Sequence, residues 1–179
     1  MELEKRNSDM TLVERLKARK LNSNICLILD VSASMSCDVE PGKSKINALR
    51  DIVSGIVGNP VCIEFSTEAR VASKNKISNP HGNTYLSKAL NLAKDQGFKD
   101  CLILTDGDVS NPDKPIALEQ AKGMNLQVMY IGAGPRPEFL DQLGSLVTTE
   151  DLRKPKELTS KIQLLLSASD ETKKGAIRL

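Results

Sequence analysis

Oxygen-bearing side chains occur at regular spacing where an apolar run of this sequence ends. The run Ile25–Leu29 is followed at once by Asp30, and the hydroxyl residues Ser32 and Ser34 come at the next alternate positions. A carboxylate and two hydroxyls are hard oxygen donors, the kind that Mg²⁺ or Mn²⁺ prefers. This spacing therefore predicts a loop that could contribute to a divalent-cation site.

Two other segments carry side chains of the same kind. Residues 81–84 place the Thr84 hydroxyl just before a predicted helix, and residues 105–108 place Asp106 directly after an apolar run. Asp and Ser also serve as ordinary turn and cap residues, so one such loop alone is weak evidence. Together, the three loops give one set of candidate metal ligands: Asp30, Ser32, Ser34, Thr84 and Asp106.

Apolar periodicity predicts the elements that would bring these loops together. Uninterrupted apolar runs bounded by polar residues are typical of strands buried on both faces. The predicted strands are residues 25–29, 61–65, 101–104, 126–131 and 146–147, with residues 69–73 as a short antiparallel edge strand. Amphipathic spacing predicts helices after Ser44 and at residues 85–96, 116–122, 137–143 and 157–166.

Alternation of strands and helices implies right-handed crossovers. We therefore expect an α/β fold with a doubly wound, mostly parallel, Rossmann-like sheet in the order 3-2-1-4-5-6, flanked by helices. In such sheets, ligands bind at the carboxyl ends of the strands where the order reverses. The first and fourth strands would be neighbours there, so that all three loops converge.

The 179 residues suggest one domain with short extensions. Residues 1–23 are expected to form an N-terminal helical extension, because Thr11 and Glu14 fit a capping box before a short apolar set. Residues 24–168 would form the domain, and residues 169–179 a solvated tail.

Composition argues against several classes of function. A net charge of +2 and 3% aromatic residues with no Trp give no support for a nucleic-acid partner or a stacking surface. No segment is long and apolar enough to span a membrane, and the N-terminus is charged where a signal peptide would be apolar, so we expect no membrane partner and a cytoplasmic location. The four cysteines lack CxxC spacing, which argues against zinc. Cys26, Cys62 and Cys101 fall in apolar runs and are expected to be buried, whereas Cys37 falls in a loop.

The three loops in this order resemble the von Willebrand factor A domain and its metal-ion-dependent adhesion site. The resemblance covers roughly residues 24–166 and is carried by Asp30-x-Ser32-x-Ser34, by Gly82-Asn83-Thr84-x-Leu86 with Ala89-Leu90, and by Thr105-Asp106-Gly107. A single DxSxS would be weak, but all three parts in the right context make a specific match.

The resemblance implies that Ser32 and Ser34 bind Mg²⁺ or Mn²⁺ directly. Thr84 would bind directly in the ligand-competent state, and Asp30 and Asp106 directly or through water. In that family, the open coordination position takes an Asp or Glu of a protein partner, and ligation is in some members coupled to movement of the last helix. Intracellular relatives often work alongside ring ATPases or stress-response systems. The resemblance thus implies a non-catalytic binding module.

Two alternatives remain open at this stage. A metal-dependent phosphoester hydrolase would need a titratable base near the metal, and sequence proximity offers His81, Asp108 and Asp38. A scaffold with a purely structural ion is the other. The segment Pro41–Ser44 imitates the end of a phosphate-binding P-loop, but the glycine which that motif requires is Cys37 here.

Overall fold

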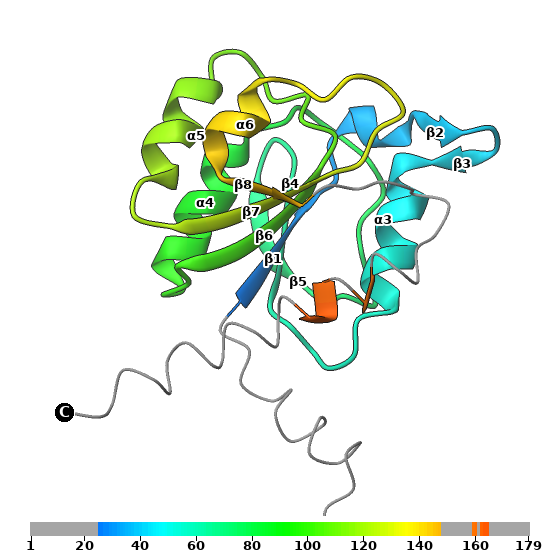
Figure 1. Ribbon diagram of the computed structural model, residues 1–179, viewed down its shortest axis with the longest axis horizontal. Helices are drawn as coiled ribbons and strands as arrows, with labels where there is room; N and C mark the ends of the chain where they lie inside the picture. Colours follow the sequence, from blue (N-terminus) through cyan, green and yellow to red (C-terminus); the bar gives the residue numbers. More distant parts are fainter. Residues whose placement is uncertain (1–24, 148–158, 161, 165–179) are drawn as a thin grey trace, which may run out of the picture.

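A six-stranded sheet forms the centre of the molecule (Figure 1). The computed structural model describes residues 25–147, 159–160 and 162–164. Its sheet strands are β1 (Ile25–Asp30), β4 (Cys62–Phe65), β5 (Ala69–Ala72), β6 (Asp100–Thr105), β7 (Asn125–Tyr130) and β8 (Ser145–Val147).

The strands lie in the order β5-β4-β1-β6-β7-β8, with β5 antiparallel to β4 and every other pair parallel. Counted along the chain, this is the order 3-2-1-4-5-6 with one antiparallel edge strand. The predicted doubly wound α/β sheet is therefore confirmed. The order reverses between β1 and β6, where the candidate loops begin.

Strand β1 has apolar side chains on both of its faces. Leu27 and Leu29 belong to one buried cluster, whereas Cys26 and Ile28 belong to the other. Successive side chains of a strand point to opposite faces, so a central strand covered on both sides needs an unbroken apolar run. This explains why the run ends only at Asp30, where the strand reaches the edge of the sheet.

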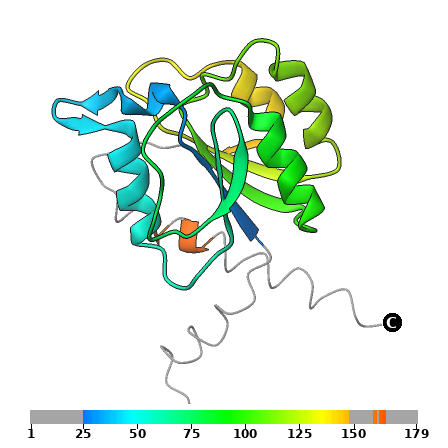
Figure 2. The same cartoon turned by 180° about the vertical axis from the view of Figure 1, so that it is seen from behind.

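Helices cover the two faces unequally (Figures 1 and 2). Helix α3 (Lys45–Ser54) packs on one face, and α4 (Leu86–Asp95), α5 (Lys114–Ala121) and α6 (Phe139–Leu143) pack on the other. Of the predicted helix 157–166, only part lies among the described residues. That part adjoins the end of α3, where Thr159 Oγ1 donates to the Ile52 carbonyl at 3.1 Å and Ile162 joins the α3 cluster.

A short hairpin precedes α3 and was not predicted. After the 3-10 turn η2 (Ala33–Ser36), strands β2 (Asp38–Glu40) and β3 (Lys43–Ser44) pair antiparallel and project beyond the sheet (Figure 1). Gly42 has a φ of 79° at its turn, a left-handed conformation that glycine adopts without penalty. The hairpin ends at Ser44, whose hydroxyl accepts from the Asn47 amide at 3.4 Å and caps α3. The P-loop-like segment is thus a hairpin turn.

The four cysteines lie where the sequence predicts. Cys26, Cys62 and Cys101 are buried and Cys37 is exposed, as predicted. Burial raises the pKa of Cys62 to about 11, which keeps it a thiol. The expected N-terminal helix and C-terminal tail lie outside the described residues. Among the helices of the described part, none is long and apolar enough to cross a membrane.

Candidate functional site

Backbone and side-chain hydrogen bonds join the three candidate loops at the carboxyl edge of the sheet. The amide of Ala33 donates to the Gly82 carbonyl at 3.1 Å, which links the first loop to the second. The amide of Ser110 donates to the Thr84 carbonyl at 3.1 Å, which links the third to the second. The Thr105 hydroxyl closes the ring by donating to Asp30 Oδ2 at 2.6 Å. The convergence expected from the strand order is therefore present.

Asp30 is fully buried, and both of its hydrogen-bond donors are neutral. Its Oδ1 accepts from the Ser32 amide at 2.9 Å and its Oδ2 from Thr105. The pKa of Asp30 is raised to about 6, chiefly by burial and also by the charge of Asp106, while the bonds from Ser32 and Thr105 oppose the rise. A carboxylate held in this way gains from any cation that reaches it.

The hydroxyls of Ser32 and Ser34 lie side by side, with 3.1 Å between their Oγ atoms. An octahedral Mg²⁺ shell has ligands at about 2.1 Å, so that neighbouring ligands are about 3 Å apart. The spacing of the two hydroxyls therefore fits two adjacent positions of such a shell. Both come from one tight turn, because Ser32 precedes η2 and Ser34 lies within it.

Asp106 is almost completely buried and contacts a residue that the sequence did not point to. Its Oδ2 lies 2.8 Å from Lys45 Nζ, and its Oδ1 accepts from the Asp108 amide at 3.1 Å. Burial lowers the pKa of Lys45, but the hydrogen bond and charge of Asp106 outweigh it, and the net pKa is raised. Lys45 therefore carries its charge in this pair. No local pattern signals it, because the partners are 61 positions apart.

Thr84 is buried and sits at the end of a long loop between β5 and α4. The loop is fastened on both sides, since the His81 amide donates to the Val31 carbonyl at 2.9 Å and the Asn83 amide donates to Thr67 Oγ1 at 2.9 Å. The backbone of Thr84 joins the second loop to the third, because the Thr84 carbonyl accepts from the Ser110 amide.

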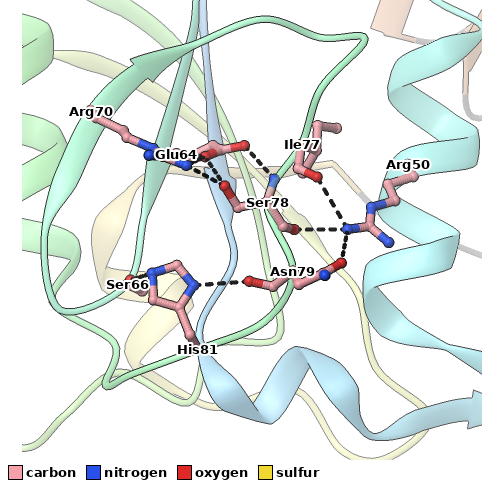
Figure 3. Close-up of polar contacts among 8 residues, drawn as sticks. All are labelled: Arg50, Glu64, Ser66, Arg70, Ile77, Ser78, Asn79 and His81. Atoms are coloured by element: carbon pink, nitrogen blue, oxygen red, sulfur yellow. Dashed lines mark hydrogen bonds and ion pairs between the residues drawn. The ribbon is translucent and has the colours of Figure 1, made fainter.

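The three residues considered as bases have separate surroundings. His81 bonds through both ring nitrogens, to Ser66 Oγ at 3.0 Å and to the Asn79 carbonyl at 2.8 Å (Figure 3). Asp108 follows Asp106 but is exposed, and Asp38 is exposed in the hairpin. Within the described residues, His81 thus acts as an anchor of the Thr84 loop.

The buried carboxylate of Glu64 on β4 anchors the same loop (Figure 3). We call Glu64, Arg70 and Ser78 together the Glu64 cluster. Glu64 accepts from the Ser78 amide and hydroxyl, each at 2.7 Å, and from two nitrogens of Arg70, each at 3.2 Å. Arg50 of α3 adds bonds to the Ile77 and Ser78 carbonyls at 3.1 and 2.9 Å. The signal that could have revealed this cluster is a charged residue inside an otherwise apolar strand.

Gly82 provides a direct test of how tightly the second loop is fitted. It has a φ of 67°, and a Cβ built there would lie 2.3 Å from Thr67 Oγ1. We expect Gly82→Ala to lower the free energy of unfolding by about 2 to 3 kcal/mol, from backbone strain and displacement of the Thr67 hydroxyl. Urea denaturation measures this loss.

Gly97→Ala is the matched control for that variant. Gly97 has a similar φ of 82° but nothing within 4 Å of its added Cβ, so this variant has only the strain cost, about 1 kcal/mol. Equal losses for the two alanine variants would contradict the tight contact between Gly82 and Thr67.

The candidate ligand set consists of two carboxylates supplemented by hydroxyls. Across the described ranges, no group of three or more His, Cys, Asp or Glu side chains could hold a metal. The five candidate residues instead offer oxygen of two kinds, which is the donor chemistry of Mg²⁺ and Mn²⁺.

Comparisons with known proteins support the fold. No family model matches the sequence, and no curated protein does. The structure is similar to a von Willebrand factor type A protein from Catenulispora acidiphila, with a TM-score of 0.58, 15% identity, and coverage of 80% of this chain and 41% of that one. It is also similar to an aerotolerance-related membrane protein from Bacteroides fragilis, with a TM-score of 0.54, 15% identity, and coverage of 78% and 98%.

A third similar structure is the PilB minor pilin from Streptococcus sanguinis, with a TM-score of 0.53, 12% identity, and coverage of 80% of this chain and 61% of that chain. At these identities the likeness concerns the fold. The chain therefore has a von Willebrand factor A-like fold, in agreement with the resemblance carried by its three loops.

Proposed function

We propose that this chain is a non-catalytic protein-binding module which holds Mg²⁺ or Mn²⁺ on its three joined loops. Ser32, Ser34 and Thr84 would supply hydroxyl oxygens, and Asp30 and Asp106 carboxylates. Such a cation, held by few charged ligands, keeps much of its attraction for a further oxygen. A protein partner presenting an Asp or Glu would fill that position.

The observation that carries this proposal is the pairing of a buried, neutrally bonded Asp30 with two hydroxyls 3.1 Å apart. Burying a carboxylate among neutral donors lowers stability, and a bound cation would offset that loss. The spacing of Ser32 and Ser34 suits one coordination shell.

A catalytic role has less support from the same residues. Metal-assisted hydrolysis needs a base that can take a proton from a metal-bound water. His81 has both ring nitrogens engaged in loop bonds, and Asp108 is exposed. We therefore infer binding in place of turnover.

Calorimetric titration with Mg²⁺ and with Mn²⁺ tests the proposal. The wild type should bind one ion per chain, and Ser34→Ala should weaken binding about tenfold by removing one ligand, an effect of about 1.4 kcal/mol. Ser36→Ala is the matched control, because its hydroxyl donates to the Ala33 carbonyl at 2.7 Å in the same turn and should leave affinity unchanged.

A short glutamate-containing peptide extends the test to the partner. It should bind the wild type only when the cation is present. No cation binding at millimolar concentrations, even with the peptide added, would overturn the proposal. Metal-dependent cleavage of a phosphate ester that Ser34→Ala abolishes would favour a hydrolase instead.

A further inference from the structure

The ion pair between Lys45 and Asp106 lies at the place where the proposed function requires a cation. The ammonium is 2.8 Å from Asp106 Oδ2, and the two side chains are 17% and 1% exposed. The two charges attract each other strongly because little water screens them, and removing either one would leave the other shielded and without a partner. The pair is therefore part of the packed sheet edge that carries the three loops.

The fold fixes Lys45 in position from the backbone. Lys45 is the first residue of α3, directly after the Ser44 cap, and its amide donates to the Cys37 carbonyl at 2.9 Å. The β2–β3 hairpin lies between these two points and ties the helix start to η2, the turn that carries Ser34. The ammonium is thus held on the same side of the sheet edge as the candidate ligands.

Both oxygens of Asp106 are already engaged in this arrangement. Oδ1 accepts from the Asp108 amide and Oδ2 pairs with Lys45. A divalent ion bound by Asp106 would meet the ammonium as a like charge a few ångströms away, and like charges at that distance repel strongly where solvent is excluded. Cation and ammonium therefore compete for one carboxylate.

We infer that Lys45 is a built-in counter-cation of Asp106, which stabilises the metal-free fold and lowers the affinity of the site for a divalent ion. This inference rests on the proposed function, since it concerns the same site. It assigns to Lys45 a specificity-determining role that the three-loop motif does not include. A divalent ion binds only if its attraction to Asp106 and the other ligands exceeds the stabilisation that the Lys45 ammonium already gives Asp106.

Lys45→Met tests the inference, because it keeps an apolar stem of similar length and removes the charge. In calorimetry with Mg²⁺ or Mn²⁺ alone, this variant should bind about tenfold to a hundredfold more tightly than the wild type. In EDTA it should melt at a lower temperature, because Asp106 loses its partner, and the added ion should restore the melting temperature.

Lys43→Met is the matched control two positions away. Its ammonium pairs at 3.0 Å with Asp51, an exposed carboxylate outside the three loops, and the variant should leave metal affinity unchanged. Lys45→Gln serves if Lys45→Met does not fold, since it keeps a hydrogen-bond donor toward Asp106 without the charge and should show the same tightening.

The outcomes separate this inference from the proposed function. Tighter binding by the Lys45 variants than by the wild type supports both. Equal or weaker binding by these variants, with a wild type that binds, overturns the counter-cation and leaves the metal site standing. If neither protein binds the ion, both hypotheses are overturned. If a Lys45 variant binds the ion and the wild type does not, the counter-cation is supported, but metal binding by the wild-type protein is overturned.

Discussion

Asp30→Asn should make the metal-free protein more stable while abolishing its response to divalent ions. Asp30 is fully buried, and burial is the largest cause of the rise of its pKa from 3.8 to about 6. A rise of this size corresponds to about 3 kcal/mol by which the folded state disfavours the charged carboxylate at neutral pH. An amide of the same shape avoids that cost.

The hydrogen bonds around residue 30 can survive the change. The Asn Oδ1 can accept from the Ser32 amide as the carboxylate does, at 2.9 Å in the wild type. The Asn amide group can donate to Thr105 Oγ1, which reverses the wild-type bond and costs the buried Thr105 hydroxyl its acceptor. We therefore expect the first and third loops to stay joined, with a net gain of about 1 to 2 kcal/mol in the free energy of unfolding.

Urea denaturation in EDTA and in saturating Mg²⁺ measures both effects. The wild type should gain stability with the ion, and Asp30→Asn should gain none, because the loss of one of two carboxylates removes much of the attraction for the cation. A variant less stable than the wild type in EDTA would show that the charge of Asp30 stabilises the fold, contrary to this reasoning.

The difference between the same two proteins should also depend on pH. The pKa of Asp30 is higher in the folded protein, so the folded state binds more protons between about pH 4 and pH 6. The stability that protonation confers is fully present below about pH 4 and is lost as the pH rises through about 6. The advantage of Asp30→Asn in EDTA should therefore grow over this window and level off above it.

The sequence predicted the sheet well because its strands are buried on both faces. Such strands leave unbroken apolar runs, as at Ile25–Leu29 and Cys101–Leu104, and the position of Asp30 marks where the run reaches the edge. Right-handed crossovers restrict the possible strand orders, and the Rossmann-like order 3-2-1-4-5-6 is the expected one among them. Local composition is sufficient to locate the strands.

The hairpin and the polar pairs needed information that local patterns do not hold. The hairpin strand Asp38–Glu40 has no apolar alternation, and the Pro41-Gly42 pair looked like a simple break. The pairing of Lys45 with Asp106 depends on tertiary placement across 61 positions. The motif identified candidate ligands, therefore, but not the charge that neutralises one of them.

Glu64→Ala is expected to have the largest destabilising effect of the variants considered for this chain. Glu64 is 2% exposed and accepts from Ser78 twice and from Arg70 twice. Alanine would leave the partly buried amide and hydroxyl of Ser78 without their acceptor. Because a hydrogen bond to a charged acceptor contributes about 1.5 to 3 kcal/mol, losing both should lower the free energy of unfolding by about 3 to 5 kcal/mol. Chemical denaturation measures the loss.

The same substitution should weaken metal binding from a distance. The Glu64 cluster fastens residues 77–79 between β4 and Arg50 of α3 (Figure 3). In the sequence, this segment leads through His81 to Thr84. Without this anchor the loop that carries Thr84 has more conformational freedom. An ion that binds must then restrict the loop, and this entropy cost reduces affinity. Calorimetry with Mn²⁺ below the melting temperature of the variant should show this reduction.

Glu68→Ala is the control that separates burial from charge. Glu68 lies four positions away, its side chain is 80% exposed, and it pairs with Lys88, so its loss should change stability by less than about 0.5 kcal/mol and leave metal affinity intact. If Glu64→Ala were destabilised but bound Mn²⁺ as tightly as the wild type, the cluster would support the fold without positioning Thr84. A joint loss of stability and affinity would instead establish that β4 and α3 hold the second loop of the site in place.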